Sequence, residues 1–262
     1  MTTAIFAAMS ILVAAAWAFQ HARRNGGWSD VCRALAMGVV GAIASLAPPF
    51  TAPGGGMGLR QLLVASLIGA WALRLGLHLR ARVLSRPEDA RYGELRAGWG
   101  RRPAVMMFLF LQAEGLAGAA VLVSVASAAH NPAPDLSASD LAGSAVLALG
   151  LLGESLADTQ LAAFAHDPRR KGQVCEAGLW RWSRHPNYFF EWFGWLAYPL
   201  IGLNAASPYP FGWASLIAPV LMYGALRYGS APLLEAHMLR SRGEAYRAYQ
   251  ARVSAFFPAP PK

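Results

Sequence analysis

The stretch AVMMFLFLQAEGLAGAAVLVSVASA, residues 104–128, decides the fold class of this chain. It contains one charged residue, Glu114, among aliphatic, aromatic and small residues. A helix needs about 20 consecutive, mostly apolar residues to cross the hydrocarbon core of a bilayer. The stretch is long enough and has no proline or polar run to interrupt it. It therefore predicts a transmembrane helix.

Six further apolar stretches extend this prediction to the whole chain. The first of them is expected to be a retained span, because it lacks a basic region before it and a small-residue cleavage site after it. With 55% hydrophobic and 14% charged residues, the composition excludes an ordinary soluble chain. We predict an all-α integral membrane protein in which residues 1–262 form one seven-helix transmembrane domain with a tail at 231–262. The other six spans are expected at 3–20, 32–50, 61–79, 140–163, 188–205 and 210–230.

The basic residues are concentrated in alternate loops. Cytoplasmic loops of membrane proteins carry an excess of Lys and Arg. This alternation predicts an N-terminus outside and a cytoplasmic C-terminus, with Arg60 as the exception among the outer loops. The cytoplasmic groups would be Arg23, Arg24 and Arg33 after the first span; Arg80, Arg82, Arg86, Arg91, Arg96, Arg101 and Arg102 after the third; Arg169, Arg170, Lys171, Arg181 and Arg184 after the fifth; and Arg240, Arg242, Arg247, Arg252 and Lys262 in the tail.

The net charge of +9 favours partners of opposite sign. The sequence carries no nucleic-acid-binding signature, so we do not expect nucleic acid. Anionic membrane lipids and a phosphate-bearing cofactor account for the charge better. Cys32 and Cys175 form no CxxC motif or Cys/His cluster, so neither a disulfide nor a metal site is predicted.

Polar residues inside four neighbouring spans require an explanation, because a charge at the centre of a membrane costs about 2.5–3.5 kcal/mol on insertion scales. One interpretation is a polar cavity open to the cytoplasm. The other is structural, with hydrogen bonds between helices or an ion pair of Arg74 with Glu114 or Glu154. The residues concerned are Arg74, His78, Gln112, Glu114, Glu154, Asp158, Thr159, Asn187 and Glu191.

The segment DPRRKGQVCEAGLWRWSRHPNYFFE, residues 167–191, combines basic and aromatic residues directly before a predicted helix start near Pro186. Proline is well tolerated at a helix start, and the helix N-terminus offers unpaired N–H groups to anions. Arg181, Arg184 and His185 are therefore a candidate phosphate site. The alternative is a basic and aromatic belt that contacts lipid headgroups.

Four blocks of the sequence, in order, resemble one known family. GLWRWSRHPNYFFEWFGW (178–195) closely resembles the signature of the bacterial DUF1295 family, which belongs with the steroid 5-alpha-reductase C-terminal superfamily. RVLSRPEDARYGELRAGWG (82–100), LADTQLAAFAHDP (156–168) and LLEAHMLRSRGEAYRAYQARVSAFFP (233–258) resemble its other elements. The resemblance covers most of the chain.

The resemblance implies a reductase in the bacterial cytoplasmic membrane, with NADPH as cofactor and the active site facing the cytoplasm. Its substrate would be a carbon–carbon double bond in a hydrophobic, steroid-like or other enone lipid that enters from the bilayer. Lys171 is an implied cofactor contact, and the run Arg169–Lys171 to which it belongs could bind either a 2′-phosphate or a lipid headgroup. The other implied cofactor contacts are Arg91, Asp158, Gln160, Arg181, Arg184, His185, Asn187, Tyr188, Glu191, Glu235, His237 and Tyr246.

The catalytic acid is less well marked. Steroid reductases activate the enone carbonyl with a Glu–Tyr pair in their N-terminal half, and this chain has no clear copy of that pair. Asp30 lies near the expected position of the Glu, while Trp71 stands where a Tyr is expected. The candidates for the catalytic group are Tyr92, Glu114 and Asp30.

Two other function classes stay open at this stage. Isoprenylcysteine carboxyl methyltransferases, which use S-adenosylmethionine, carry an R-x-P-x-Y element that resembles Arg184–Tyr188 and a tail that resembles Glu235–Tyr246. The dense arginines and Asn187 favour a phosphate-rich cofactor over the adenosyl sulfonium. A transporter or lipid-binding scaffold is the third possibility, but the two halves of the chain show no matching broken helices.

Overall fold

The computed structural model describes residues 1–48, 58–85, 87–88, 90–203 and 209–262, with backbone alone at residues 90 and 91. It divides into two compact units, Met1–Asp140 with Tyr198–Ala218, and Leu141–Ala197 with Pro219–Lys262. Within these described ranges, five helices are long and apolar enough to cross a membrane, which confirms the transmembrane character. The ends of two predicted spans, at 49–50 and 204–205, lie outside the described residues.

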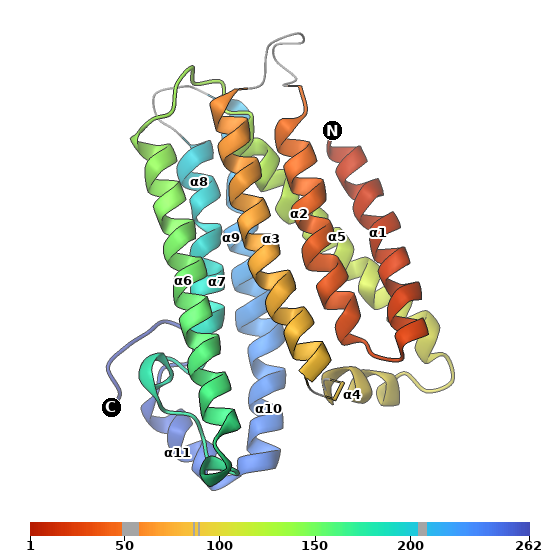
Figure 1. Cartoon of the computed structure of the whole chain (residues 1–262), viewed down its shortest axis with the longest axis vertical. Coiled ribbons are helices and arrows are strands. Elements are labelled where there is room, and N and C mark those ends of the chain that lie inside the picture. Colours follow the sequence, from red (N-terminus) through yellow and green to blue (C-terminus); the bar gives the residue numbers. More distant parts are fainter. Residues whose placement is uncertain (49–57, 86, 89, 204–208) are drawn as a thin grey trace. The chain divides into compact units, whose positions relative to one another are not determined.

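The first unit is built around four of these helices (Figure 1). They are α1 (Thr2–Arg23), α2 (Gly27–Leu46), α3 (Leu59–Ser85) and α5 (Pro103–Ala129), with the short α4 (Ala90–Gly98) between α3 and α5. α2 packs against α1, α3 and α5, while the 3-10 segment η3 (Pro210–Leu216) packs against α5.

Small residues allow α2 and α3 to approach closely. A Cβ atom on Gly38 of α2 would lie 2.2 Å from the Cβ of Ala72 on α3. Lipid offers little hydrophobic driving force between helices, so such close van der Waals packing supplies much of the association energy. Gln112 of α5 adds polar contacts to α1, because it accepts a hydrogen bond from the Ser10 hydroxyl at 2.7 Å. This confirms the structural interpretation for Gln112.

Arg60, the exception to the loop pattern, is buried at the start of α3 and is only 5% exposed. Its guanidinium pairs with the fully buried Asp140 at 2.8 Å. It also donates to the carbonyls of Asn131, Ala133 and Asp135 at 2.5–3.0 Å. Arg60 is thus neutralised inside the unit and ties the loop that follows α5 to α3, which explains why it departs from the charge pattern.

The second unit contains most of α6 (Ala138–His166), then η1 (Pro168–Arg170), η2 (Gly178–Arg181) and α7 (Pro186–Trp195). After α8 (Ala197–Gly202) and η3, the chain re-enters it in α9 (Ile217–Gly224). It continues through the π-helical η4 (Ala225–Ser230) into α10 (Ala231–Arg242) and α11 (Glu244–Arg252). α6 and α7 touch at glycines: a Cβ on Gly150 would lie 2.7 Å from the Cα of Gly194.

The sixth and seventh predicted spans differ from the first five. Residues 188–205 are divided between α7 and α8, and residues 210–230 between η3, α9 and η4. Proline explains these interruptions, because it lacks the N–H that a helix needs and clashes with the carbonyl four residues earlier. Pro199 removes the bond to Trp195 at the end of α7, and Pro232 removes the bond to Tyr228 within η4. The seven-span topology and its orientation therefore stay predictions.

Candidate functional site

The segment Ser183–His185, between η2 and α7, has its backbone fixed by the C-terminal end of the chain. The Ser183 hydroxyl accepts from the His185 N–H at 3.1 Å and donates to the Phe256 carbonyl at 2.8 Å. The Arg184 N–H donates to the Ser254 carbonyl at 2.8 Å. The segment thus enters α7 in one defined conformation, which aims its two basic side chains toward α10.

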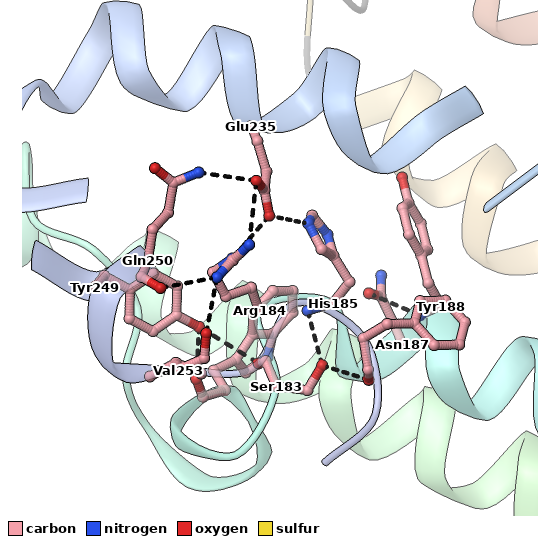
Figure 2. A network of polar contacts seen from close by, with 11 residues as sticks. Ser183, Arg184, His185, Asn187, Tyr188, Glu235, Tyr249, Gln250 and Val253 are labelled. Atoms are coloured by element: carbon pink, nitrogen blue, oxygen red, sulfur yellow. Dashed lines mark hydrogen bonds and ion pairs between the residues drawn. The ribbon is translucent and has the colours of Figure 1, made fainter. Parts of the chain in front are cut away.

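Glu235 of α10 is the centre of the polar network in Figure 2. One carboxylate oxygen accepts from Arg184 Nε at 2.7 Å and from His185 Nε2 at 3.0 Å. The other accepts from Gln250 Nε2 at 2.8 Å and from an Arg184 terminal nitrogen at 3.3 Å. All four donors come from sequence positions that are distant from the carboxylate, so this one group joins the segment before α7, α10 and α11.

These donors determine the charge of the carboxylate. Burial alone would raise the pKa of Glu235, but the hydrogen bonds from His185 and Arg184, together with the Arg184 charge, lower that pKa to about 2. Glu235 is therefore ionised at neutral pH.

Arg184 is occupied almost completely by the protein itself. Beyond its two bonds to Glu235, it donates to the carbonyls of Gln250 and Val253 at 3.0 and 2.8 Å. An arginine side chain has five N–H donors, and four of them are used here. The expected contact between Arg184 and a phosphate stays a prediction, and one N–H of the guanidinium is available for it.

His185 has one satisfied and one unsatisfied ring nitrogen. Its side chain is 2% exposed, and Nε2 bonds to Glu235. Nδ1 is buried and has no hydrogen-bond partner among the described residues. The ring stacks on Tyr188, with centroids 5.3 Å apart and planes 9° from parallel. The imidazole is thus held by Glu235 and Tyr188, while its Nδ1 has no partner among the described residues.

The structure brings the α6 element beside the start of α7. Asn187 Nδ2 donates to Asp158 Oδ1 at 3.2 Å, which joins two predicted cofactor residues. Gln160 accepts from the backbone N–H of Leu179 at 2.8 Å and so positions η2. Glu191, one turn into α7, accepts from the indole of Trp195 at 3.0 Å.

Two tyrosines of α11 pack beneath the Arg184 segment. Tyr249 donates to the Trp180 carbonyl at 2.5 Å and is almost wholly buried. Tyr246 is buried beside it, and the two rings lie 5.7 Å apart. Burial raises the pKa of both hydroxyls, and the nearby Glu235 charge raises that of Tyr246 further. Both stay protonated at neutral pH and support the network as neutral side chains.

Three of the remaining predicted cofactor residues make no bond to this network among the described residues. Lys171, Arg181 and His237 have exposed side chains. They are available to a soluble anion or to lipid headgroups. The side chain of Arg91 lies outside the described residues.

The three catalytic candidates belong to the first unit, where Arg33 of α2 links them. Arg33 donates to Asp30 at 2.8 Å and forms an ion pair with Glu114 at 3.6 Å. Tyr92 is fully buried and interacts electrostatically with Arg33, and its hydroxyl lies 3.4 Å from that of Ser29. Arg33 therefore joins Asp30 and Glu114 through one guanidinium.

Sequence reasoning missed the residues that organise both groups. Arg33 was counted only as a loop charge, although its position three residues after Asp30 on a helix was a usable signal. Gln250 and Ser183 carried no such signal, because their partners are 15 and 73 residues away.

Comparison with known proteins places most of the chain in one family. Residues 16–253 match the model of a family described as "Protein of unknown function (DUF1295)". An uncharacterized protein of Schizosaccharomyces pombe is 35% identical over 85 residues, which is 31% of this chain and 22% of that protein. The chain thus aligns with about a fifth of that relative's length. No solved structure matches.

Proposed function

Because the chain belongs to the DUF1295 family, we propose that it is a membrane-bound, NADPH-dependent reductase of a carbon–carbon double bond in a hydrophobic enone lipid, steroid-like or related. The observation that carries the proposal is the buried His185 Nδ1, beside Tyr188 and the Asn187–Asp158 pair. A buried polar atom left unpaired costs free energy unless a bound molecule satisfies it.

The described residues fit an uncharged, donor-bearing part of such a cofactor at His185 and an anionic part at the exposed cations. Lys171 and Arg181 offer charge to phosphate groups. When bound, the reduced nicotinamide supplies the hydride. The chain's own residues orient the ligand and hold the proton that the developing enolate requires.

For that proton, the Arg33 group supplies three candidates within one unit. Arg33 fixes Asp30 and Glu114 by ion pairs, and Tyr92 lies within its field. A positively charged group also stabilises negative charge that develops on a substrate oxygen. We include in the proposal the seven-span topology with a cytoplasmic C-terminus. In that topology the soluble cofactor enters from the cytoplasm, whereas the hydrophobic substrate enters from the bilayer. Reporter fusions after residue 262 and within 131–137 would test that orientation.

A methyltransferase that uses S-adenosylmethionine is the second candidate, and one observation favours it. Four N–H groups of Arg184 are bound within the protein, so the expected phosphate site has one strong cation fewer. A sulfonium cofactor without phosphate would need no such site.

Equilibrium binding to the detergent-purified protein separates the two. We would measure NADPH, NADH and S-adenosylmethionine with wild type, Lys171→Gln, Arg181→Gln and, as a matched exposed control, Arg247→Gln. The reductase predicts NADPH binding that weakens several-fold in Lys171→Gln or Arg181→Gln and is unchanged in the control. Loss of reduced-nicotinamide absorbance with enone lipids would then follow. Binding of S-adenosylmethionine without NADPH would reject the reductase.

A further inference from the structure

The tautomer of His185 can be derived from its partner. A carboxylate accepts hydrogen bonds and cannot donate them while ionised. Glu235 is ionised and lies 3.0 Å from Nε2, so Nε2 must carry the proton. In a neutral imidazole the other nitrogen is then a lone-pair acceptor. Nδ1 is that nitrogen, and it is the buried atom without a hydrogen-bond partner among the described residues.

The contacts of Glu235 with Arg184 favour the neutral form of the His185 ring. Arg184 already pairs with this carboxylate at 2.7 Å and balances its charge. An imidazolium would add a second buried cation to the same carboxylate and leave its Nδ1–H without an acceptor among the described residues. Neither cost arises for the neutral ring with its proton on Nε2.

We propose that His185 is held in this single tautomer and that its Nδ1 accepts a hydrogen bond from an uncharged donor of the bound cofactor, a ribose hydroxyl or an amide N–H. Glu235 is the positioning residue that fixes the tautomer. The cofactor's identity rests on the proposed function, but both candidate cofactors carry ribose hydroxyls. A phosphate is excluded as the partner. At neutral pH its ionised oxygens accept hydrogen bonds, and the unprotonated Nδ1 is also an acceptor, so neither atom can donate to the other.

Two substitutions separate the two ring nitrogens. His185→Gln places an amide nitrogen near the Nε2 position and can keep the contact with Glu235, but it has no acceptor near Nδ1. His185→Asn places its amide near the Nδ1 position and gives up the contact with Glu235. We expect His185→Gln to weaken NADPH binding about tenfold, and His185→Asn to weaken it less. The affinity for inorganic pyrophosphate should be the same in wild type and both variants.

The test begins with nitrogen-15 NMR of histidine-labelled wild-type protein in detergent, assigned with His185→Gln. We expect a protonated Nε2 and an unprotonated Nδ1 whose signal moves when NADPH or S-adenosylmethionine is added. In Glu235→Ala, which leaves no side-chain acceptor for Nε2–H at this position, the single tautomer should be lost. Thermal unfolding of each variant shows whether a loss of binding reflects a loss of folding.

The outcomes are distinguishable from those of the function itself. A proton on Nδ1, or an Nδ1 signal that a bound cofactor leaves unmoved, would overturn the inference even if the protein reduces enones. Equal weakening of pyrophosphate binding in His185→Gln would overturn it as well. If wild type binds S-adenosylmethionine alone, the reductase fails while the NMR result still decides the role of His185.

Discussion

Replacing Glu235 by Gln tests how strongly the polar network holds the C-terminal helices. The amide keeps the size of the side chain, but it removes the charge and turns an NH₂ group toward Arg184 or Gln250, which are themselves donors. A pKa of about 2, against 4.5 for a solvated glutamate, corresponds to at most about 3 kcal/mol. The Glu235 side chain is 17% exposed, so solvent screening weakens its interactions. We therefore expect the substitution to lower the free energy of unfolding by about 2 kcal/mol.

Hydrogen exchange measured by mass spectrometry on peptides that cover 182–185 and 249–259 reports this free energy. A loss of about 2 kcal/mol raises the population of the opened state about 30-fold, and exchange should accelerate accordingly. Glu244→Gln is the matched control, because Glu244 lies in the same tail, is 83% exposed and pairs only with the exposed Arg247 among the described residues. The control should exchange like wild type.

The pH dependence gives the same prediction a sign. The folded-state pKa of Glu235 is depressed, so its stabilising contribution is fully present above pH 4.5 and is lost as the pH falls toward 2. Wild type and Glu235→Gln should therefore differ at neutral pH and converge across that window. Equal exchange of the two proteins at neutral pH would refute the assignment of Glu235 as the link between these segments.

Two further substitutions probe the packing of each unit. Arg60→Met should destabilise the detergent-solubilised protein by about 3–5 kcal/mol, because Asp140 is left charged and buried. Combining Arg60→Met with Asp140→Leu should recover part of that loss in thermal unfolding. An absence of recovery would contradict the ion-pair account. Gly150→Ala should lower the free energy of unfolding by about 1–3 kcal/mol, because the new Cβ would meet the backbone of Gly194. The control Gly224→Ala should be neutral, because its Cβ would have no neighbour within 4 Å. Similar melting temperatures for the two variants would argue against close packing of α6 and α7.

The long helices could be predicted from the sequence because lipid imposes a simple rule on their composition. The expected spans 104–128 and 140–163 correspond to α5 at Pro103–Ala129 and α6 at Ala138–His166. The rule does not resolve the last two expected spans, which stay predictions, because mean apolarity is insensitive to where a proline interrupts the hydrogen bonds. The charge pattern likewise cannot distinguish an exposed cation from Arg60, whose partner Asp140 is 80 residues away.

The site was predictable in part for a related reason. Residues on one helical face, such as Asp158 near Gln160, follow from local spacing, and the basic segment before α7 stands out by composition. The Glu235 network does not, since its bonds join positions 15–51 residues apart. Only the folded chain shows that Arg184 is directed to a carboxylate and two carbonyls, and that Nδ1 of His185 has no hydrogen-bond partner among the described residues.

Arg33 changes how the catalytic candidates should be tested. The guanidinium of Arg33 lies 2.8 Å from a carboxylate oxygen of Asp30 and 3.6 Å from one of Glu114. Tyr92 interacts electrostatically with the same guanidinium. Groups with a common partner are not independent, so the effects of single substitutions are not expected to add. Removing Asp30 frees Arg33 to move toward Glu114, and a loss of activity in that variant would not identify Asp30 as the acid. A double-mutant cycle of Asp30→Asn and Glu114→Gln in the presence of Arg33 separates the group that holds the proton from the group that positions it.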